Sequence, residues 1–130
     1  MLRRKQTNIW KQGERDAARF MKRLGCRILA RNLRLSVGEI DLLCQEKQSG
    51  TIIVVEVKAR SYSDDSYKRI DPVASITEKK KHKLRTLAKA IKRMPEYAKS
   101  PIRIDVIGIR YDFGQRKPEI THYPSAVADH

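Results

Sequence analysis

The first quarter of the chain has the hydrophobic spacing of a helix followed by a strand. Residues 11–24 place apolar side chains at intervals of three and four positions, as the buried side of a helix requires. These positions are Ala17, Phe20, Met21 and Leu24. Gly25 is placed to end the helix, and residues 26–32 then alternate in polarity, which predicts a strand.

Two stronger strand patterns follow, over residues 38–45 and 51–60. Both are rich in β-branched and other apolar residues, and the polar residues 46–50 (EKQSG) between them predict a hairpin. Residues 61–73 are polar and contain a proline, so they are predicted to form a loop.

The second half of the chain predicts one more helix and at least one more strand. Residues 76–94 carry a helical apolar side, and Ser75 with Glu78 fits a capping box at its start. That apolar side consists of Leu84, Leu87, Ala88 and Ile91. Residues 102–109 predict a strand, and 110–123 are expected to turn back on it.

The order of helix, three strands, helix and strand predicts an α/β fold with a mixed β-sheet flanked by helices. We expect a single domain over residues 1–130, with a core at about 9–110 and a C-terminal extension over 111–130.

Positive charge is concentrated in two segments. The 130 residues include 29 Lys and Arg against 15 Asp and Glu, a net charge of +14. Residues 1–34 carry +9 and residues 77–93 carry +7, whereas residues 35–76 carry −2. This excess favours a polyanionic partner, most simply nucleic acid, because contacts to phosphates release counterions. A solvated basic face without a specific partner is the alternative.

Several other classes of protein are disfavoured. No stretch approaches the roughly 20 apolar residues that a membrane-spanning helix needs. The basic start of the chain leads into no apolar segment of the kind found in secretory signals, so we expect a cytoplasmic protein without a membrane partner. Cys26 and Cys44 lack the spacing of a zinc site, and we expect two buried thiols.

The predicted hairpin carries charged residues on one face of each strand. If a four-residue turn over 47–50 joins the strands, Asp41 lies opposite Glu56. Glu39 then lies opposite Lys58. On the other face, the same register pairs Ile40 with Val57 and Leu42 with Val55.

Two carboxylates on opposed strands repel each other unless a cation or a proton lies between them. Oxygen ligands suit Mg²⁺ or Mn²⁺, and Lys58, beside Glu56, could orient the attacking water or neutralise charge on a phosphate. Cross-strand ion pairs on a solvent-facing hairpin are an equally weighted interpretation.

Two further charged residues lie on the apolar sides of the predicted helices. Glu14 lies within the inward side of the first helix, and a buried carboxylate needs a partner. A metal ion, Arg27 or Arg31 would serve. Lys80 of the second helix either points at a phosphate or extends to solvent.

Two residues are predicted to have structural roles. Asp105, within an apolar strand, is expected to pair with an arginine rather than bind a metal. Trp10 is expected to pack onto the core in front of the first helix.

These segments resemble the YraN family, a group of small bacterial predicted endonucleases similar to archaeal Holliday-junction resolvases. The motifs that carry the resemblance are Gly13-Glu14, Arg31-Asn32, residues 38–42 (GEIDL), residues 55–60 (VEVKAR), Lys80 and residues 104–106 (IDV). The resemblance implies a restriction-endonuclease-like fold of the PD-(D/E)xK type, with an αβββαβ core. Ile40 stands where that motif has its proline.

The resemblance also implies Asp41, Glu56 and Lys58 as the catalytic trio, with Glu14 as the carboxylate of the first helix. The expected function is a divalent-metal-dependent DNA endonuclease, acting on junction or branched DNA in repair or recombination and leaving a 5′-phosphate. The expected ligands of Mg²⁺ or Mn²⁺ are Asp41, Glu56, Glu14 and the Val57 carbonyl. Supporting residues are Glu39, Arg60 and Lys80. Expected nucleic-acid contacts are Lys79, Lys80, Lys81, Lys83, Arg31 and Arg34.

Two other functions fit the same charge pattern. One is a nucleic-acid-binding module that does not cleave. The other is an interaction protein whose basic helix over 76–94 binds an acidic partner. A homodimer is expected if the substrate is a four-way junction, because two-fold substrates suit a symmetric pair of sites.

Overall fold

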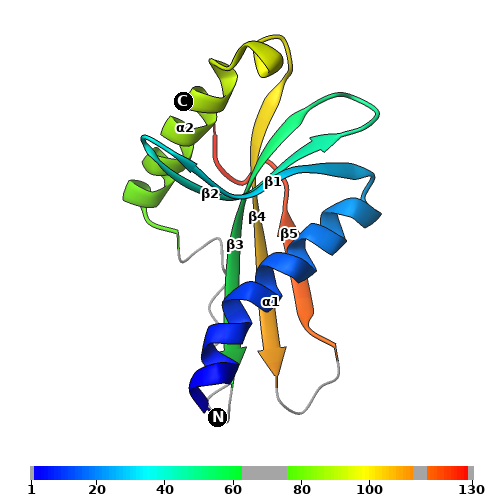
Figure 1. The fold of residues 1–130 in the computed structure, drawn as a ribbon, viewed down its shortest axis with the longest axis vertical. Helices are drawn as coiled ribbons and strands as arrows, with labels where there is room; N and C mark the ends of the chain where they lie inside the picture. The colour runs from blue at the N-terminus through cyan, green and yellow to red at the C-terminus, as the bar shows by residue number, and fades with distance from the viewer. Residues whose placement is uncertain (1, 63–75, 113–116, 129–130) are drawn as a thin grey trace.

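The computed structural model describes residues 2–62, 76–112 and 117–128, which form two α-helices, a short 3₁₀ helix and a five-stranded sheet (Figure 1). In chain order the elements are α1 (Leu2–Arg23), β1 (Cys26–Leu35), β2 (Gly38–Glu46), β3 (Ile52–Tyr62), α2 (Glu78–Lys92), η1 (Pro95–Tyr97), β4 (Ile102–Asp112) and β5 (Glu119–Tyr123). The strands lie side by side in the order β1-β2-β3-β4-β5. Only the β3–β4 pair is parallel, so the sheet is mixed. The predicted αβββαβ order is confirmed.

The two helices cover opposite faces of the sheet, as the alternation of buried residues along β3 shows. Ile53 and Val55 pack in a cluster with the inner side of α1, whereas Ile52 and Val54 pack in a second cluster with α2. Figure 1 shows α1 lying across β3, β4 and β5. Both cysteines are buried free thiols in the α1-side cluster, as predicted.

The ends of the helices confirm one prediction and correct two. Gly25 ends α1 with a φ of +91°, a conformation that glycine adopts without strain. Leu24, predicted to be buried, is 49% exposed because α1 ends at Arg23 and Leu24 lies in the turn. The cap of α2 is Thr77 rather than Ser75, because the helix begins at Glu78 and the Thr77 hydroxyl accepts from the Lys80 amide at 3.1 Å.

Other boundaries differ modestly from prediction. Helix α1 begins at Leu2 rather than at residue 11, and β3 continues through Tyr62, so the predicted loop over 61–73 starts later. Residues 63–73 of that loop and Ser75 lie outside the described residues. Strand β4 continues through Asp112, and β5 then pairs antiparallel with it, which confirms that the chain turns back on this strand.

The predicted hairpin register holds for only part of its length. Leu42 pairs with Val55 as expected, but this is the last pair of the β2–β3 ladder. Before Leu42, β2 remains paired with β1, and beyond Val55, β3 continues beside β4. The sheet therefore forks at this point, and in Figure 1 the β1–β2 hairpin turns away from β3 and β4.

The fork makes two of the predicted pairs wrong, Ile40 with Val57 and Glu39 with Lys58, whereas Asp41 still lies beside Glu56. Ile40 packs in the α2-side cluster and Val57 packs against the α1-side cluster, so the two do not form one apolar layer. Glu39 pairs across to Arg34 of β1, with an exposed ion pair at 3.6 Å, rather than lying opposite Lys58. The physical reason is that β2 has left β3 before these residues could meet.

Helix α1 approaches β3 unusually closely at Gly13. A Cβ atom added to Gly13 would lie 2.8 Å from the Cβ of Ala59. This contact holds the middle of α1 against the end of β3 that carries Lys58 and Arg60. None of the described helices is long and apolar enough to cross a membrane.

We expect Gly13→Ala to destabilise the protein by about 1–3 kcal/mol, because overpacking outweighs the gain in helix propensity. In a Gly13→Ala/Ala59→Gly double variant the clashing atom is absent, so the two changes should cost less together than the sum of their separate costs. Urea unfolding of all four proteins measures this coupling. Strictly additive costs would show that the Gly13–Ala59 contact does not set the spacing of α1 and β3.

Candidate active site

A cavity of about 170 Å³ lies where β2 and β3 diverge. Four elements contribute to it, namely α1, β2, β3 and α2. Its lining residues are Trp10, Glu14, Asp41, Glu56, Val57, Lys58, Ala59, Arg60 and Lys80. The structure therefore brings together the predicted trio, Glu14, Arg60 and Lys80. Glu39 is not among the lining residues.

Asp41 is fixed at the fork by the backbone of β3. The Val57 amide donates a hydrogen bond of 2.9 Å to Asp41 Oδ2, so the side chain accepts from an amide that faces the fork. Burial, and then the negative charge of Glu56, raise the pKa of Asp41 to about 7. Near neutral pH, this pair of carboxylates therefore shares a proton or needs a cation.

Glu56 is 6% exposed and lies against two ammonium groups. Lys58 Nζ is 3.7 Å and Lys80 Nζ is 3.2 Å from the same oxygen, Glu56 Oε2. Lys80 therefore does not simply extend into solvent, because it points from α2 to the acidic centre. The two lysines stabilise the negative charge of Glu56 in a place where it is largely removed from water.

Glu14 reaches the cavity from α1 and is held by a residue whose role the sequence did not reveal. Asn32 Nδ2 donates a hydrogen bond of 2.9 Å to Glu14 Oε2, whereas the partners considered from the sequence were a metal ion, Arg27 and Arg31. Asn32 has a φ of +49°, a left-handed conformation that asparagine tolerates better than most residues. The sequence offered one signal for this role, namely the asparagine of the Arg31-Asn32 motif, which lies within a predicted strand.

The donor set fits a hydrated divalent ion. Among the described residues, no three His, Cys, Asp or Glu side chains are grouped as a ready-made metal centre. Mg²⁺ and Mn²⁺ bind through one or two carboxylates and retain several waters, so Asp41 and Glu56 beside an open cavity suffice. Burial is the main cause of the raised pKa of Asp41, and the negative charge of Glu56, which Lys80 offsets only in part, raises it further.

Trp10 corrects another prediction. Its side chain is 72% exposed and lines the cavity, so it does not pack onto the core. Because α1 starts at Leu2, Trp10 lies within the helix rather than in front of it, and among the described residues it is one of two large hydrophobic residues that are exposed.

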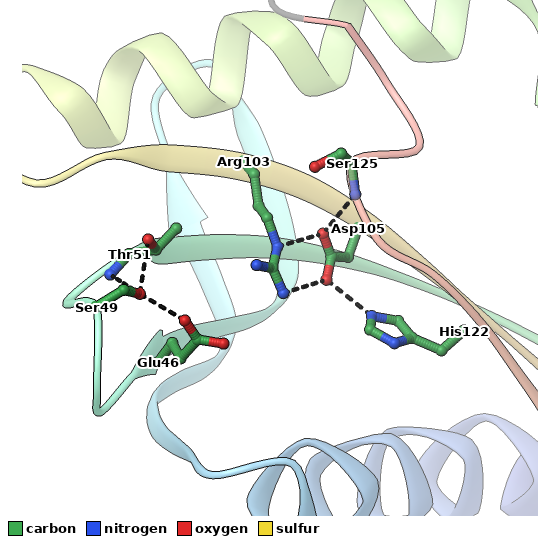
Figure 2. Close-up of polar contacts among 7 residues, drawn as sticks. All are labelled: Glu46, Ser49, Thr51, Arg103, Asp105, His122 and Ser125. Carbon is green, nitrogen blue, oxygen red and sulfur yellow. Dashed lines mark hydrogen bonds and ion pairs between the residues drawn. The ribbon is translucent and has the colours of Figure 1, made fainter.

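Asp105 belongs to a separate, fully paired network, shown in Figure 2. It is completely buried, and its carboxylate accepts from Arg103 Nε at 3.0 Å and from the Ser125 amide at 2.9 Å. His122 Nε2 lies 2.8 Å from its other oxygen. The predicted arginine partner is confirmed, and the network holds β4, β5 and the segment after β5 together.

The basic residues predicted to contact nucleic acid occur on two elements. Exposed on β1 and α2 are Arg31, Arg34, Lys79 and Lys83. Lys81 instead pairs with Glu78 at 3.3 Å. Because α2 also carries Lys80, its exposed lysines lie on the element that closes one side of the cavity.

Comparison with known proteins identifies relatives along most of the chain. The model of the family described as "Uncharacterised protein family UPF0102" matches residues 13–109. A UPF0102 protein of Mycolicibacterium smegmatis is 36% identical over 110 residues, covering 85% of each chain. A UPF0102 protein of Roseiflexus castenholzii is 33% identical over 126 residues, covering 96% of this chain and 97% of that one.

One solved structure shows a weak likeness. It is SfsA of Pyrococcus furiosus in complex with Ca²⁺, with 16% sequence identity and a TM-score of 0.32. The match covers 80% of this chain and 56% of that chain.

The raised pKa of Asp41 predicts a specific dependence of stability on pH. The folded state binds the Asp41 proton more tightly than the unfolded state, whose aspartates titrate near pH 4. Its stabilising contribution is therefore complete below about pH 4 and is lost as the pH rises through about 7. Asp41→Asn can still accept from the Val57 amide but does not titrate.

In the presence of a chelator, we expect the wild type to lose about 1–3 kcal/mol more unfolding free energy than Asp41→Asn between about pH 5 and pH 8. Urea unfolding at both pH values measures the difference. Parallel losses in the two proteins would contradict the raised pKa.

Proposed function

This chain belongs to the uncharacterised protein family UPF0102, which confirms the predicted YraN-like relationship, and we propose that it is a divalent-metal-dependent DNA endonuclease. The observation that carries the proposal is the paired Asp41 and Glu56 carboxylates, with Lys58 and Lys80 against Glu56, in a cavity at the fork of the sheet. Perturbed titration in a cavity is typical of catalytic sites.

Each residue of the cavity would have a distinct role in phosphodiester hydrolysis. Asp41, Glu56 and the Val57 carbonyl would hold Mg²⁺ or Mn²⁺, with Glu14 as a fourth oxygen donor. When bound, the ion supplies Lewis acidity to the phosphate and makes a water more acidic. Carboxylates that repel each other in its absence are stabilised in its presence, so ion binding and the loss of the shared proton are linked.

We assign to Lys58 the direct role on the reacting groups. Its ammonium donates to the water or to a phosphate oxygen, and its positive charge stabilises the extra negative charge of the transition state. The water oxygen forms a bond to phosphorus, and the bond from phosphorus to the 3′ oxygen breaks. The proton of the water ends on the departing 3′ oxygen, which leaves a 5′-phosphate and a 3′-hydroxyl.

Lys80 would contact the substrate from the side of the cavity that α2 forms. In the structure its ammonium rests on Glu56 Oε2, at 3.2 Å. With Glu56 bound to a cation, Lys80 would be free to contact a phosphate oxygen. Arg60, exposed at the rim, is the second cation available to the DNA backbone.

Binding of the DNA backbone is assigned to the exposed basic residues of β1 and α2. These are Arg31, Arg34, Lys79 and Lys83. Contacts to phosphates fix position and orientation but carry no base sequence. We therefore propose selection by DNA shape, with branched or junction DNA as the substrate class.

A nucleic-acid-binding protein without catalysis is the second candidate. The observation that favours it is that Glu56 already has two ammonium partners, Lys58 and Lys80, which could replace a metal ion permanently. Under this alternative, DNA binding is salt-sensitive but indifferent to Mg²⁺, Mn²⁺ and substitution of Asp41.

We expect Asp41→Asn and Glu56→Gln each to lower metal-dependent cleavage of branched DNA by at least about 100-fold while binding persists, because each removes charge from the ion site. Cleavage of labelled duplex, flap and four-way-junction DNA with Mg²⁺ or Mn²⁺ measures this. Glu39→Gln is the matched control, since it removes a carboxylate from the same strand outside the cavity. Unchanged cleavage in Asp41→Asn would exclude the proposed site, and binding with no cleavage by the wild type would favour the second candidate.

The backbone contacts have a separate test. Lys79→Ala and Arg31→Ala should each weaken binding to all DNAs and reduce the slope of log affinity against log salt concentration by about 1. Fluorescence anisotropy across a salt series measures that slope. Lys99→Ala, an exposed lysine outside the two basic segments, should leave it unchanged. Equal effects of all three substitutions would indicate attraction by net charge alone.

A further inference from the structure

The side chain of Trp10 is unusually exposed for so large an apolar group. It is the one tryptophan of the sequence and is 72% accessible to solvent at the rim of the cavity. Leu24 is the other large hydrophobic side chain that is exposed among the described residues, and it lies in the turn after α1, outside the cavity lining. None of the catalytic roles assigned above uses an aromatic ring.

The position of Trp10 is set by the packing of α1. Trp10 lies one helical turn before Glu14, on the same side of the helix. The close contact of Gly13 with Ala59 fixes this turn of α1 against β3. Trp10 and Arg60 consequently line the same cavity as the carboxylates. The indole is therefore held beside the acidic centre from a rigid element.

An exposed indole beside a phosphodiester site offers a flat surface to a nucleobase. Stacking of bases on aromatic side chains is a common and sequence-tolerant contribution to binding of single strands. Inside a continuous duplex, each base already has neighbours on both faces, so a side chain cannot stack on it without disrupting the helix. The ring suits a base that is unpaired or has been displaced from its stack.

We propose that Trp10 stacks on an unpaired nucleotide next to the phosphodiester that is cleaved at the site of Asp41, Glu56 and Lys58. This inference rests on the proposed endonuclease function and narrows its substrate class to DNA with a single-stranded or displaced nucleotide at the cleavage position. Continuous duplex makes the backbone contacts of β1 and α2 but leaves the indole in water.

Emission from Trp10 reports on the contact directly, since no other tryptophan contributes. Two DNAs with the same number of phosphates are titrated in chelator: a blunt duplex and a duplex carrying a single-stranded flap. Anisotropy of a label on the DNA measures binding, and N-acetyltryptophanamide corrects for absorption by the DNA. We expect the flap DNA to quench Trp10 emission and the blunt duplex to bind without quenching it.

Substitution tests the energetic role of the ring. Trp10→Ala should weaken binding of flap DNA about 5- to 150-fold and leave blunt duplex unaffected. Trp10→Phe should retain most of the preference, and Leu24→Ala, the matched exposed hydrophobic residue, should change neither affinity. Because Trp10 is exposed, unchanged thermal unfolding is expected for its variants.

Two results would overturn the stacking role while leaving the endonuclease intact. The first is that flap DNA binds without changing Trp10 emission. The second is that Trp10→Ala weakens the binding of both DNAs equally. In each case, cleavage would still depend on Asp41. Failure of both DNAs to bind, with Mg²⁺ as well as in chelator, would instead overturn the stacking role together with the proposed function.

Discussion

The candidate site depends on one hydrogen bond at the fork of the sheet. Past Leu42 and Val55, β2 stays paired with β1 while β3 stays paired with β4. A strand that loses its neighbour leaves backbone amides in need of an acceptor. Asp41 provides that acceptor for Val57, so the same contact that closes the end of the ladder fixes a carboxylate inside the fork, beside Glu56. The cavity and its acidic centre exist because the two strands separate at this residue.

Two carboxylates of this protein, the buried Asp105 and the half-buried Asp41, show how the number of hydrogen-bond partners affects a charge that is removed from water. Asp105 is completely buried, but a guanidinium, an imidazole and a backbone amide satisfy it (Figure 2). Asp41 accepts from one backbone amide, and burial together with the charge of Glu56 raises its pKa to about 7, although Lys80 lowers it in part. The hydrogen-bond network of Asp105 is complete without a bound ion or ligand. The repulsion between Asp41 and Glu56 is relieved when a proton or a cation lies between them.

The elements of the fold were largely predictable because each depends on periodicity over a few residues. The apolar spacing around Met21 and the alternation across the hairpin located α1, β2 and β3 in the sequence, and the Leu42–Val55 pair followed from the length of the turn. The first residue of a helix was harder to predict, because Ser75 and Thr77 are both good caps and tertiary packing decides which one is used. The pairing of Glu39 with β1 could not be predicted either. Alternation of polar and apolar residues shows which face a residue occupies but not the position at which a strand separates from its neighbour.

By itself, the sequence determined the order of the elements, the excess of positive charge and the identities of the acidic and basic residues of the site, because these follow from composition, motif and local period. The tertiary structure decided how those residues meet. The fork turned an expected cross-strand pair into an acidic centre at the end of a ladder, brought Lys80 to Glu56, and matched Glu14 with Asn32. The close approach of α1 to β3 left Trp10 at the rim of the cavity. Such contacts join residues far apart in the chain, and they depend on the balance of packing among all the elements, which no local pattern encodes.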